Sequence, residues 1–188
     1  QVMDGIRNRL RTLQSDEPLV SVVVIAYNEE KHLPACLWSL SESVCEYPME
    51  IIGVNNDSAD RTADVFEASG IPYHTELQHS CGYARRCGLQ YAQGKYYICI
   101  DSDTMYPPGY VQAMTDALQR PGIVAVSSLW SYMPDEGHPW LGLKIYEFMR
   151  DTHLWMQSFK RPELSVRGLV FAYNADYGRK VGYRVDII

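Results

Sequence analysis

The chain has 188 residues, 46% of them hydrophobic and 12% aromatic, which suffices for one well-filled domain and falls short of two. Its 17 basic and 23 acidic side chains give a formal charge of −6, which argues against a surface that neutralises nucleic-acid phosphates. No apolar run approaches the roughly 18 residues of a membrane helix, and residues 1–18 lack a signal-peptide core. We therefore expect one soluble domain that does not bind nucleic acid.

Strands and helices alternate through the first 103 residues. A charged helix is predicted at 3–13, and the β-branched run at 19–27 is typical of a strand covered on both faces. Pro34 fits the first turn of the next helix. Further strands are predicted at 49–55, 71–77 and 95–100, and helices at 58–70 and 81–94. Ser58 or Asp60 is expected to cap the helix that ends at Gly70.

The remainder is less regular. A helix is predicted at 107–122, a strand at 123–130, and a strand and short helix at 167–182. Hydrophobic residues at 139–159 step by four and three, which indicates an amphipathic helix. We assign its aromatic side to the core or to a lid, with a membrane surface as the less favoured alternative. The alternation as a whole predicts a layered α/β domain with right-handed crossovers.

The five cysteines contain no C-x-x-C pair and include several within apolar periodic stretches: Cys36, Cys45, Cys81, Cys87 and Cys99. A free thiol in such a stretch packs as a small hydrophobe. The pattern indicates a reducing compartment, and the predicted location is the cytoplasm, with the inner face of the membrane as an alternative.

Two carboxylates, Asp101 and Asp103, directly follow a buried strand in "YYICIDSDTM". If the strand geometry continued they would share a face and repel one another. Ligands of open α/β sheets bind beyond the carboxyl ends of the strands, where two carboxylates suit Mg²⁺ or Mn²⁺. A divalent cation would remove the repulsion and bridge to a phosphorylated ligand. The alternative is that Asp101 caps the loop and Asp103 is simply solvated.

Polar residues also end the first two strands, in "AYNEE" at 26–30 and "NNDSADRT" at 55–62. Each segment alone is compatible with ordinary turn chemistry. Together they bring polar side chains to one edge of the sheet, beside the aspartate pair.

Three ordered blocks resemble family 2 glycosyltransferases, which are inverting enzymes with the GT-A fold: "SVVVIAYNEEKHLPACLWSL", "NNDSADRT" and "GYARRCGLQYAQGKYYICIDSD". The likeness spans about Val20 to Asp103 and is weaker through Tyr183. It implies a three-layer α/β sandwich with a mainly parallel sheet. It also implies a single domain, 1–188, in which 1–103 is the nucleotide-sugar-binding half. Residues 104–188 would form the acceptor-side half, incomplete at its C-terminus.

The resemblance implies nucleotide-sugar contacts from both strand-end loops and from the segment around Arg85. The residues concerned are Ala26, Tyr27, Asn28, Glu29, Asn55, Asn56, Ser58, Asp60, Arg85, Asp101 and Ser102. Residues 101–103 match the family's Asp-x-Asp motif, in which the last aspartate is the usual direct metal ligand. Asp103 and Asp101 are therefore the predicted ligands of Mn²⁺ or Mg²⁺.

The sequence also departs from the family pattern. Asn55 and Asn56 stand where many members carry acidic residues that read uracil, and Arg86 replaces an asparagine. A UDP-sugar is the favoured donor, with a GDP-sugar as the alternative. The family's acidic catalytic base is expected beyond Ile188, with Asp186 and Asp176 as weak substitutes.

The implied activity is metal-assisted transfer of a sugar, with inversion, to a hydroxyl of a glycan or lipid-linked acceptor. The pathway would be cell-envelope polysaccharide or glycolipid synthesis, with peripheral membrane association. Aromatic faces suit sugar rings, so the acceptor is expected among Trp130, Trp140, Trp155 and Tyr173, of which we assign at least half to the core. The alternative is a non-catalytic nucleotide-sugar-binding module. A sugar-1-phosphate nucleotidyltransferase is less favoured because "AYNEEKH" is not a glycine-rich basic loop.

Overall fold

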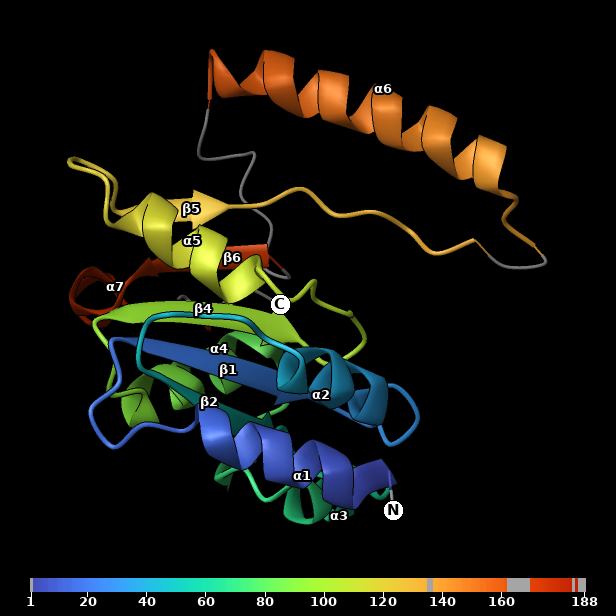
Figure 1. Ribbon diagram of the computed structural model, residues 1–188. Helices are drawn as coiled ribbons and strands as arrows, with labels where there is room; N and C mark the ends of the chain where they lie inside the picture. The colour runs from blue at the N-terminus through green and yellow to red at the C-terminus, as the bar shows by residue number, and fades with distance from the viewer. Residues whose placement is uncertain (1, 135–136, 162–169, 184, 186–188) are drawn as a thin grey trace.

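The computed structural model describes residues 2–134, 137–161, 170–183 and 185. Its centre is a six-stranded sheet with the order β3-β2-β1-β4-β6-β5 (Figure 1). The strands are β1 (Val20–Ala26), β2 (Met49–Asn55), β3 (Tyr73–Thr75), β4 (Tyr96–Asp101), β5 (Ala125–Ser127) and β6 (Val170–Asn174). Strands β1 to β4 run parallel, and β6 is antiparallel to β4 and β5. The predicted mainly parallel α/β sandwich is confirmed.

Helices cover both faces of this sheet. They are α1 (Val2–Leu13), α2 (Leu33–Ser41), α3 (Thr62–Ser69), α4 (Cys81–Tyr91), α5 (Tyr110–Leu118), α6 (Trp140–Ser158) and α7 (Ala175–Val181). Val22 and Val24 of β1 pack into a core with α1, α2, α3 and α5. Val23 and Ile25 face the opposite core, which α4 and α7 complete. All of β1 is buried, as the β-branched run predicts.

Helix α4 lies unusually close to the sheet. A Cβ added to Gly88 would overlap Val23 Cγ1 and would lie 3.0 Å from the Tyr97 hydroxyl. Glycine therefore allows this close approach and fixes the first turns of α4 beside the ends of β1 and β4. The helix ends three residues before the predicted stop at Gly94, because Gly94 leaves the helix and donates its N–H to Ser21 Oγ at 2.8 Å.

The predicted caps of α3 are corrected by the structure. The N-cap residue is Arg61, and neither Ser58 nor Asp60 occupies that position. Asp60 instead joins the helix start to the first-strand loop, because its carboxylate accepts the N–H groups of both Thr62 and Glu30 at 3.0 Å. Gly70 ends the helix in the left-handed conformation, with φ 72°, as predicted.

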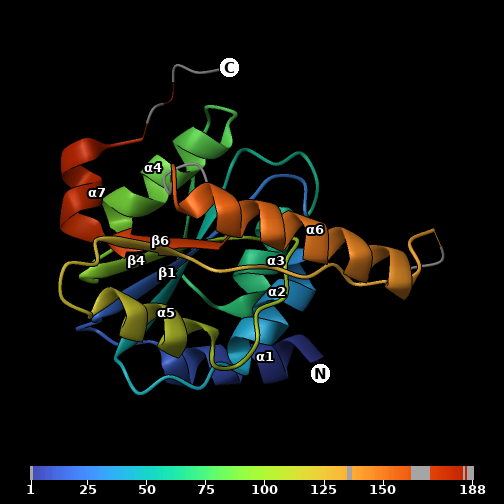
Figure 2. The ribbon, with the colours of Figure 1, turned by 90° about the horizontal axis from the view of Figure 1, so that it is seen from above.

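Helix α6 exists as predicted, but the assignment of its aromatic side to the core is wrong. Only Glu147 and Leu154 are buried in it. Figure 1 shows α6 beyond the β5–β6 end of the sheet, and Figure 2, seen from that side, shows it lying over the other elements. The periodicity located an apolar stripe without fixing which way it faces. In the part of the chain that the structure describes, no helix is long and apolar enough to cross a membrane.

The cysteines are free thiols. Cys36, Cys87 and Cys99 are buried in the two cores, as their apolar surroundings predict, whereas Cys81 is exposed.

Candidate functional site

A cavity of about 520 Å³ opens beyond the carboxyl ends of β1 and β4. Eight residues predicted from the sequence line it: Ala26, Tyr27, Glu29, Asn56, Arg85, Asp101, Ser102 and Asp103. The remaining lining residues are Ile25, His79, Ser80, Cys81 and Ala84. The cavity therefore lies where open parallel sheets bind their ligands, and most of the predicted site converges there.

Arg85 and Asp101 form an ion pair inside this cavity. Arg85 Nη2 donates to Asp101 Oδ1 at 3.1 Å, and the two side chains are 15% and 30% exposed. Burial raises the pKa of Asp101 above its ordinary value, and the Asp103 charge adds to the rise while Arg85 opposes it. Arg85 Nε is buried and has no hydrogen-bond partner among the described residues. The guanidinium thus keeps donor capacity for an anion.

Asp103 has a different environment from Asp101. The strand ends at Asp101, so Asp103 lies in the following turn and is exposed. Its carboxylate accepts a hydrogen bond from the Thr104 hydroxyl at 3.1 Å. Both carboxylates nevertheless line the one cavity. Among the described residues, no group of three or more His, Cys, Asp or Glu side chains could hold a metal ion. Two carboxylates fit Mg²⁺ or Mn²⁺ when ligand phosphates and water supply the other oxygens, which is the usual arrangement for Mg²⁺.

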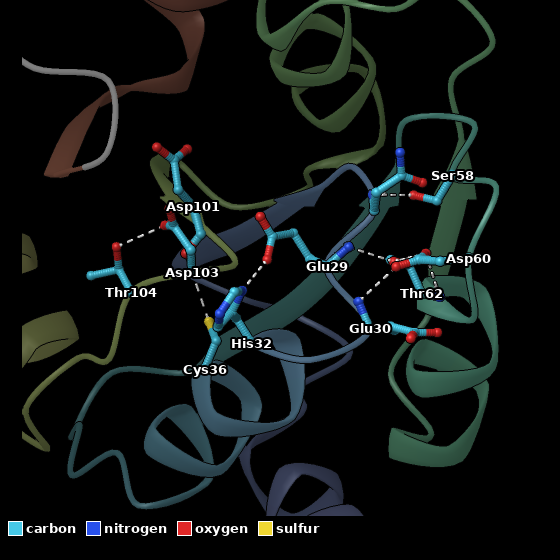
Figure 3. A network of polar contacts seen from close by, with 11 residues as sticks. Glu29, Glu30, His32, Cys36, Ser58, Asp60, Thr62, Asp101, Asp103 and Thr104 are labelled. Atoms are coloured by element: carbon cyan, nitrogen blue, oxygen red, sulfur yellow. Dashed lines mark hydrogen bonds and ion pairs between the residues drawn. The ribbon is translucent and has the colours of Figure 1, made fainter.

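Four predicted residues do not line the cavity: Asn28, Asn55, Ser58 and Asp60. Asn28, Ser58 and Asp60 join the two strand-end loops, as Figure 3 shows for Ser58 and Asp60, whereas Asn55 bonds within its own loop. The Asn28 N–H donates to Ser58 Oγ at 3.0 Å, and Asn28 Oδ1 accepts the Ala59 N–H at 2.8 Å. Asn55 Oδ1 accepts the Ser58 N–H at 3.1 Å. In this structure the four residues position the neighbouring Tyr27, Glu29 and Asn56.

Asn56 is buried, and its orientation is fixed by two carbonyl groups. Its Nδ2 donates to the Glu76 and Gln78 carbonyl oxygens, both at 2.8 Å. Because both acceptors are carbonyls, the amide nitrogen must face them. The side chain therefore has only its oxygen left, as an acceptor, for a group in the cavity.

Glu29 brings a third carboxylate to the same cavity. Its Oε2 lies 2.7 Å from His32 Nδ1, and its backbone N–H donates to Thr62 Oγ1 at 2.8 Å. Glu29 is thus fixed at both its main chain and its side chain.

Sequence reasoning missed the segment from His79 to Cys81, which starts α4. Ser80 caps the helix by accepting the Tyr83 N–H at 3.2 Å, and the first turn faces the cavity through Cys81 and Ala84. The partial positive charge of a helix N-terminus favours anions there. A serine before an amphipathic run is a recognisable cap signal. His79, whose ring centroid lies 5.1 Å from that of Tyr27, carries no such signal.

The remaining predicted residues lie elsewhere. Asp176 is on α7, exposed and paired with Arg179 at 3.2 Å, and does not line the cavity. Asp186 is outside the described residues. Of the expected acceptor aromatics, Tyr173 is buried in the core, while Trp140 and Trp155 are exposed on α6. Trp130 stacks under the Arg150 guanidinium at 4.3 Å. None of the four lines the cavity.

Known proteins similar to this chain are glycosyltransferases. EpsH of Bacillus subtilis, described as a glycosyltransferase, is 34% identical over 105 residues, which cover 53% of this chain and 30% of that protein. The validoxylamine A glucosyltransferase of Streptomyces hygroscopicus is 26% identical over 167 residues, covering 80% of this chain and 37% of the relative. The chain thus spans about a third of the length of these two relatives.

Solved structures share the fold. The mannosyltransferase PcManGT of Pyrobaculum calidifontis, in complex with GDP-Man and Mn²⁺, gives a TM-score of 0.68 at 17% identity, covering 99% of this chain and 56% of that one. Glucosyl-3-phosphoglycerate synthase of Mycobacterium tuberculosis, in complex with Mn²⁺, UDP and glucosyl-3-phosphoglycerate, gives a TM-score of 0.61 at 23% identity. The match covers 90% of this chain and 61% of the synthase. The fold is therefore of the GT-A type.

A family model described as Glycosyl transferase family 2 matches residues 21–176, which include every residue that lines the cavity and, apart from Val20 at the start of β1, the six strands of the sheet. On this match, the chain belongs to glycosyl transferase family 2.

Proposed function

We propose that this chain binds a nucleoside-diphosphate sugar and transfers the sugar, with inversion, to a hydroxyl group of an acceptor. The observation that carries the proposal is the cavity, which combines a partly unsatisfied arginine, a helix N-terminus and an exposed carboxylate. These are the groups needed for a diphosphate and its counter-cation. The similarity to nucleotide-sugar transferases supports the same activity.

The diphosphate would lie against Arg85 and the first turn of α4. The Arg85 guanidinium lines the cavity beside the first turn of α4, so an anionic oxygen bound there would accept hydrogen bonds from it. Departure of the diphosphate builds negative charge at this point. Arg85 and the α4 N-terminus are held in place before the reaction, so they stabilise that charge without reorganising.

Asp103, together with Asp101, would hold Mn²⁺ or Mg²⁺. When bound, such a cation neutralises charge on the phosphate oxygens and favours departure of the nucleotide. PcManGT and the synthase were crystallised with Mn²⁺, which agrees with this choice of ion. The two aspartates have separate tasks: Asp101 orients Arg85, and Asp103 keeps its oxygens accessible.

Asn56 supports a donor whose base carries a ring N–H. The amide nitrogen is committed to two carbonyl groups, so only Oδ1 remains to accept a hydrogen bond from the base. Uracil and guanine can donate through a ring N–H, whereas adenine and cytosine can donate only through an exocyclic amino group. Because the cavity is walled by Tyr27 and His79, a ring can also stack there. We favour a UDP-sugar, with a GDP-sugar as the alternative.

Inversion requires a carboxylate that removes the proton of the acceptor hydroxyl. Asp176 is paired with Arg179 away from the cavity, so we assign no base among the described residues. The acceptor would be a glycan or a lipid-linked molecule of the cell envelope, modified on the cytoplasmic side. A relative from Pyrococcus furiosus, 24% identical over 114 residues, is named dolichol-phosphate mannosyltransferase, which is consistent with a lipid-linked acceptor.

The test is release of the nucleoside diphosphate from UDP-glucose and from GDP-mannose in the presence of Mn²⁺. We expect release from one of the two donors and its loss in Asp103→Ala. The matched control Asp64→Ala removes an exposed carboxylate of α3, outside the cavity, and should keep full activity. If the wild-type chain and the Asp64→Ala control bind a donor but release no nucleoside diphosphate, the result would contradict transfer. It would favour a nucleotide-sugar-binding module.

A further inference from the structure

Helix α6 contacts the preceding segment, at Trp130 and Tyr132, through its polar side. The buried Glu147 carboxylate accepts the Tyr132 N–H and the Lys144 ammonium, both at 2.7 Å. One turn further, the Arg150 guanidinium stacks over Trp130 and donates to the Trp130 carbonyl oxygen at 2.6 Å. The charged groups of Glu147 and Arg150, which would normally face water, therefore face this segment.

The opposite side of α6 carries an apolar stripe that faces away from the protein. Its members recur at helical spacing and are between 53% and 74% exposed: Leu141, Ile145, Phe148, Met149, Trp155, Met156 and Phe159. A surface helix normally turns such a stripe toward the core. An exposed apolar patch of this extent marks an interaction surface.

The charge around this stripe is opposite to that of the whole chain. Residues 138–161 carry four basic and two acidic side chains, whereas the rest of the chain carries 13 basic and 21 acidic ones. Both acidic groups lie off the stripe and are paired, Glu147 with Lys144 at 2.7 Å and Asp151 with Arg150 at 2.8 Å. Lys160 and Arg161 follow the helix directly, and both are exposed.

We propose that the apolar stripe of α6 docks into the interface of a membrane that contains anionic lipids. Helices that lie in such an interface combine a Trp- and Phe-bearing apolar face with flanking basic residues. The stripe has these properties, and the net positive charge of 138–161 complements the negative lipid surface. The rest of the chain, with its excess of acidic groups, is repelled from that surface, so α6 sets the orientation of the protein on the membrane.

A second copy of the chain is a poorer fit to the same stripe. A helix of 19 residues is about 29 Å long, so a stripe roughly 10 Å wide covers about 300 Å². A stable protein interface buries about 800 Å² on each partner. A bilayer accepts a single narrow stripe, because each apolar side chain is inserted independently of its neighbours.

The proposal is tested by sedimentation of the chain with vesicles of phosphatidylcholine, with and without phosphatidylglycerol. We expect binding to the anionic vesicles and at least tenfold weaker binding to the neutral ones. The double variant Phe148→Glu, Trp155→Glu should lose at least tenfold in affinity, since burial of one such side chain alone exceeds a factor of ten. The matched control Val44→Glu changes an equally exposed apolar residue, in the loop after α2, and should bind like the wild type.

Two further measurements make the outcome decisive. Because all the altered side chains are exposed, circular dichroism should show an unchanged fold. Lys160→Glu should weaken binding to anionic vesicles and leave binding to neutral ones unchanged. Equal affinity for both kinds of vesicle, or full binding by the double variant, would overturn the proposal. The proposal would also be overturned if the chain did not bind vesicles but formed a dimer in solution, and if the double variant were a monomer. None of these readouts depends on nucleotide or sugar transfer.

Discussion

The part of the chain up to Asp103 and the part after it are built differently. In the first part β1 and β2 are buried along their whole length, and every residue that lines the cavity lies between Ile25 and Asp103. In the second part β5 has exposed ends and α6 buries only Glu147 and Leu154. The contrast therefore separates a well-packed part, which carries all the residues that line the candidate site, from a more exposed part. The second part contributes the exposed apolar stripe of α6.

The largest effect should come from the close packing in the first part. Gly88→Ala places a methyl group against Val23 Cγ1 and the Tyr97 hydroxyl, so α4 must move away from the sheet. Overpacking of this kind costs about 1–3 kcal/mol in the free energy of unfolding, which urea denaturation measures. An unchanged denaturation midpoint would show that α4 is not held as tightly as the structure indicates.

Arg85→Lys sharpens the comparison at the cavity itself. A lysine keeps the positive charge but lacks the planar guanidinium of Arg85. That group donates to Asp101 through Nη2 and has further N–H groups with which to bind an anion. We expect about a tenfold loss in affinity for the nucleoside diphosphate, since one charge-assisted hydrogen bond is worth about 1.5 kcal/mol. The rate constant kcat should fall as well, because Arg85 is proposed to stabilise the charge that builds on the departing diphosphate. Affinity equal to that of the wild type would remove Arg85 from the site.

Asp60 tests how the two strand-end loops hold each other. Its partial burial would raise the pKa, but hydrogen bonds from Thr62 and Glu30 outweigh this and lower the pKa below the ordinary value. The stabilisation is therefore complete above the ordinary pKa and is lost as the pH falls through the lower, folded-state value. Asp60→Asn should reduce stability by about 1 kcal/mol at neutral pH. The difference from the wild type should shrink in acid, as urea denaturation across pH would record.

The smallest effect should come from the second part and have the opposite sign. Gly142 lies in α6, where an added Cβ meets nothing closer than Pro139 Cγ at 4.0 Å. Gly142→Ala should therefore stabilise the helix by about 0.5–1 kcal/mol through helix propensity. Helical content by circular dichroism and thermal unfolding would record it. A destabilised protein would mean that α6 has a packing partner on that side.

The sequence predicted those features that local pattern determines. Residues 49–55 form the predicted strand, Gly70 ends its helix, and Asp101 and Asp103 both line the cavity. Two kinds of feature were not predictable in this way. The outward direction of the α6 stripe depends on hydrogen bonds from the Glu147 and Arg150 side chains to the backbone at Tyr132 and Trp130, because periodicity gives a stripe but no direction. His79 reaches the cavity only through the packing of the β3–α4 segment on Tyr27.

The most direct test of the account is calorimetric titration of the chain with UDP and with GDP, each with and without Mn²⁺. The account predicts that one nucleotide binds, that Mn²⁺ strengthens the binding, and that Asp103→Ala removes the metal-dependent part. Binding of neither nucleotide, or binding that Mn²⁺ and Asp103→Ala leave unchanged, would contradict the assignment of the cavity as a donor site.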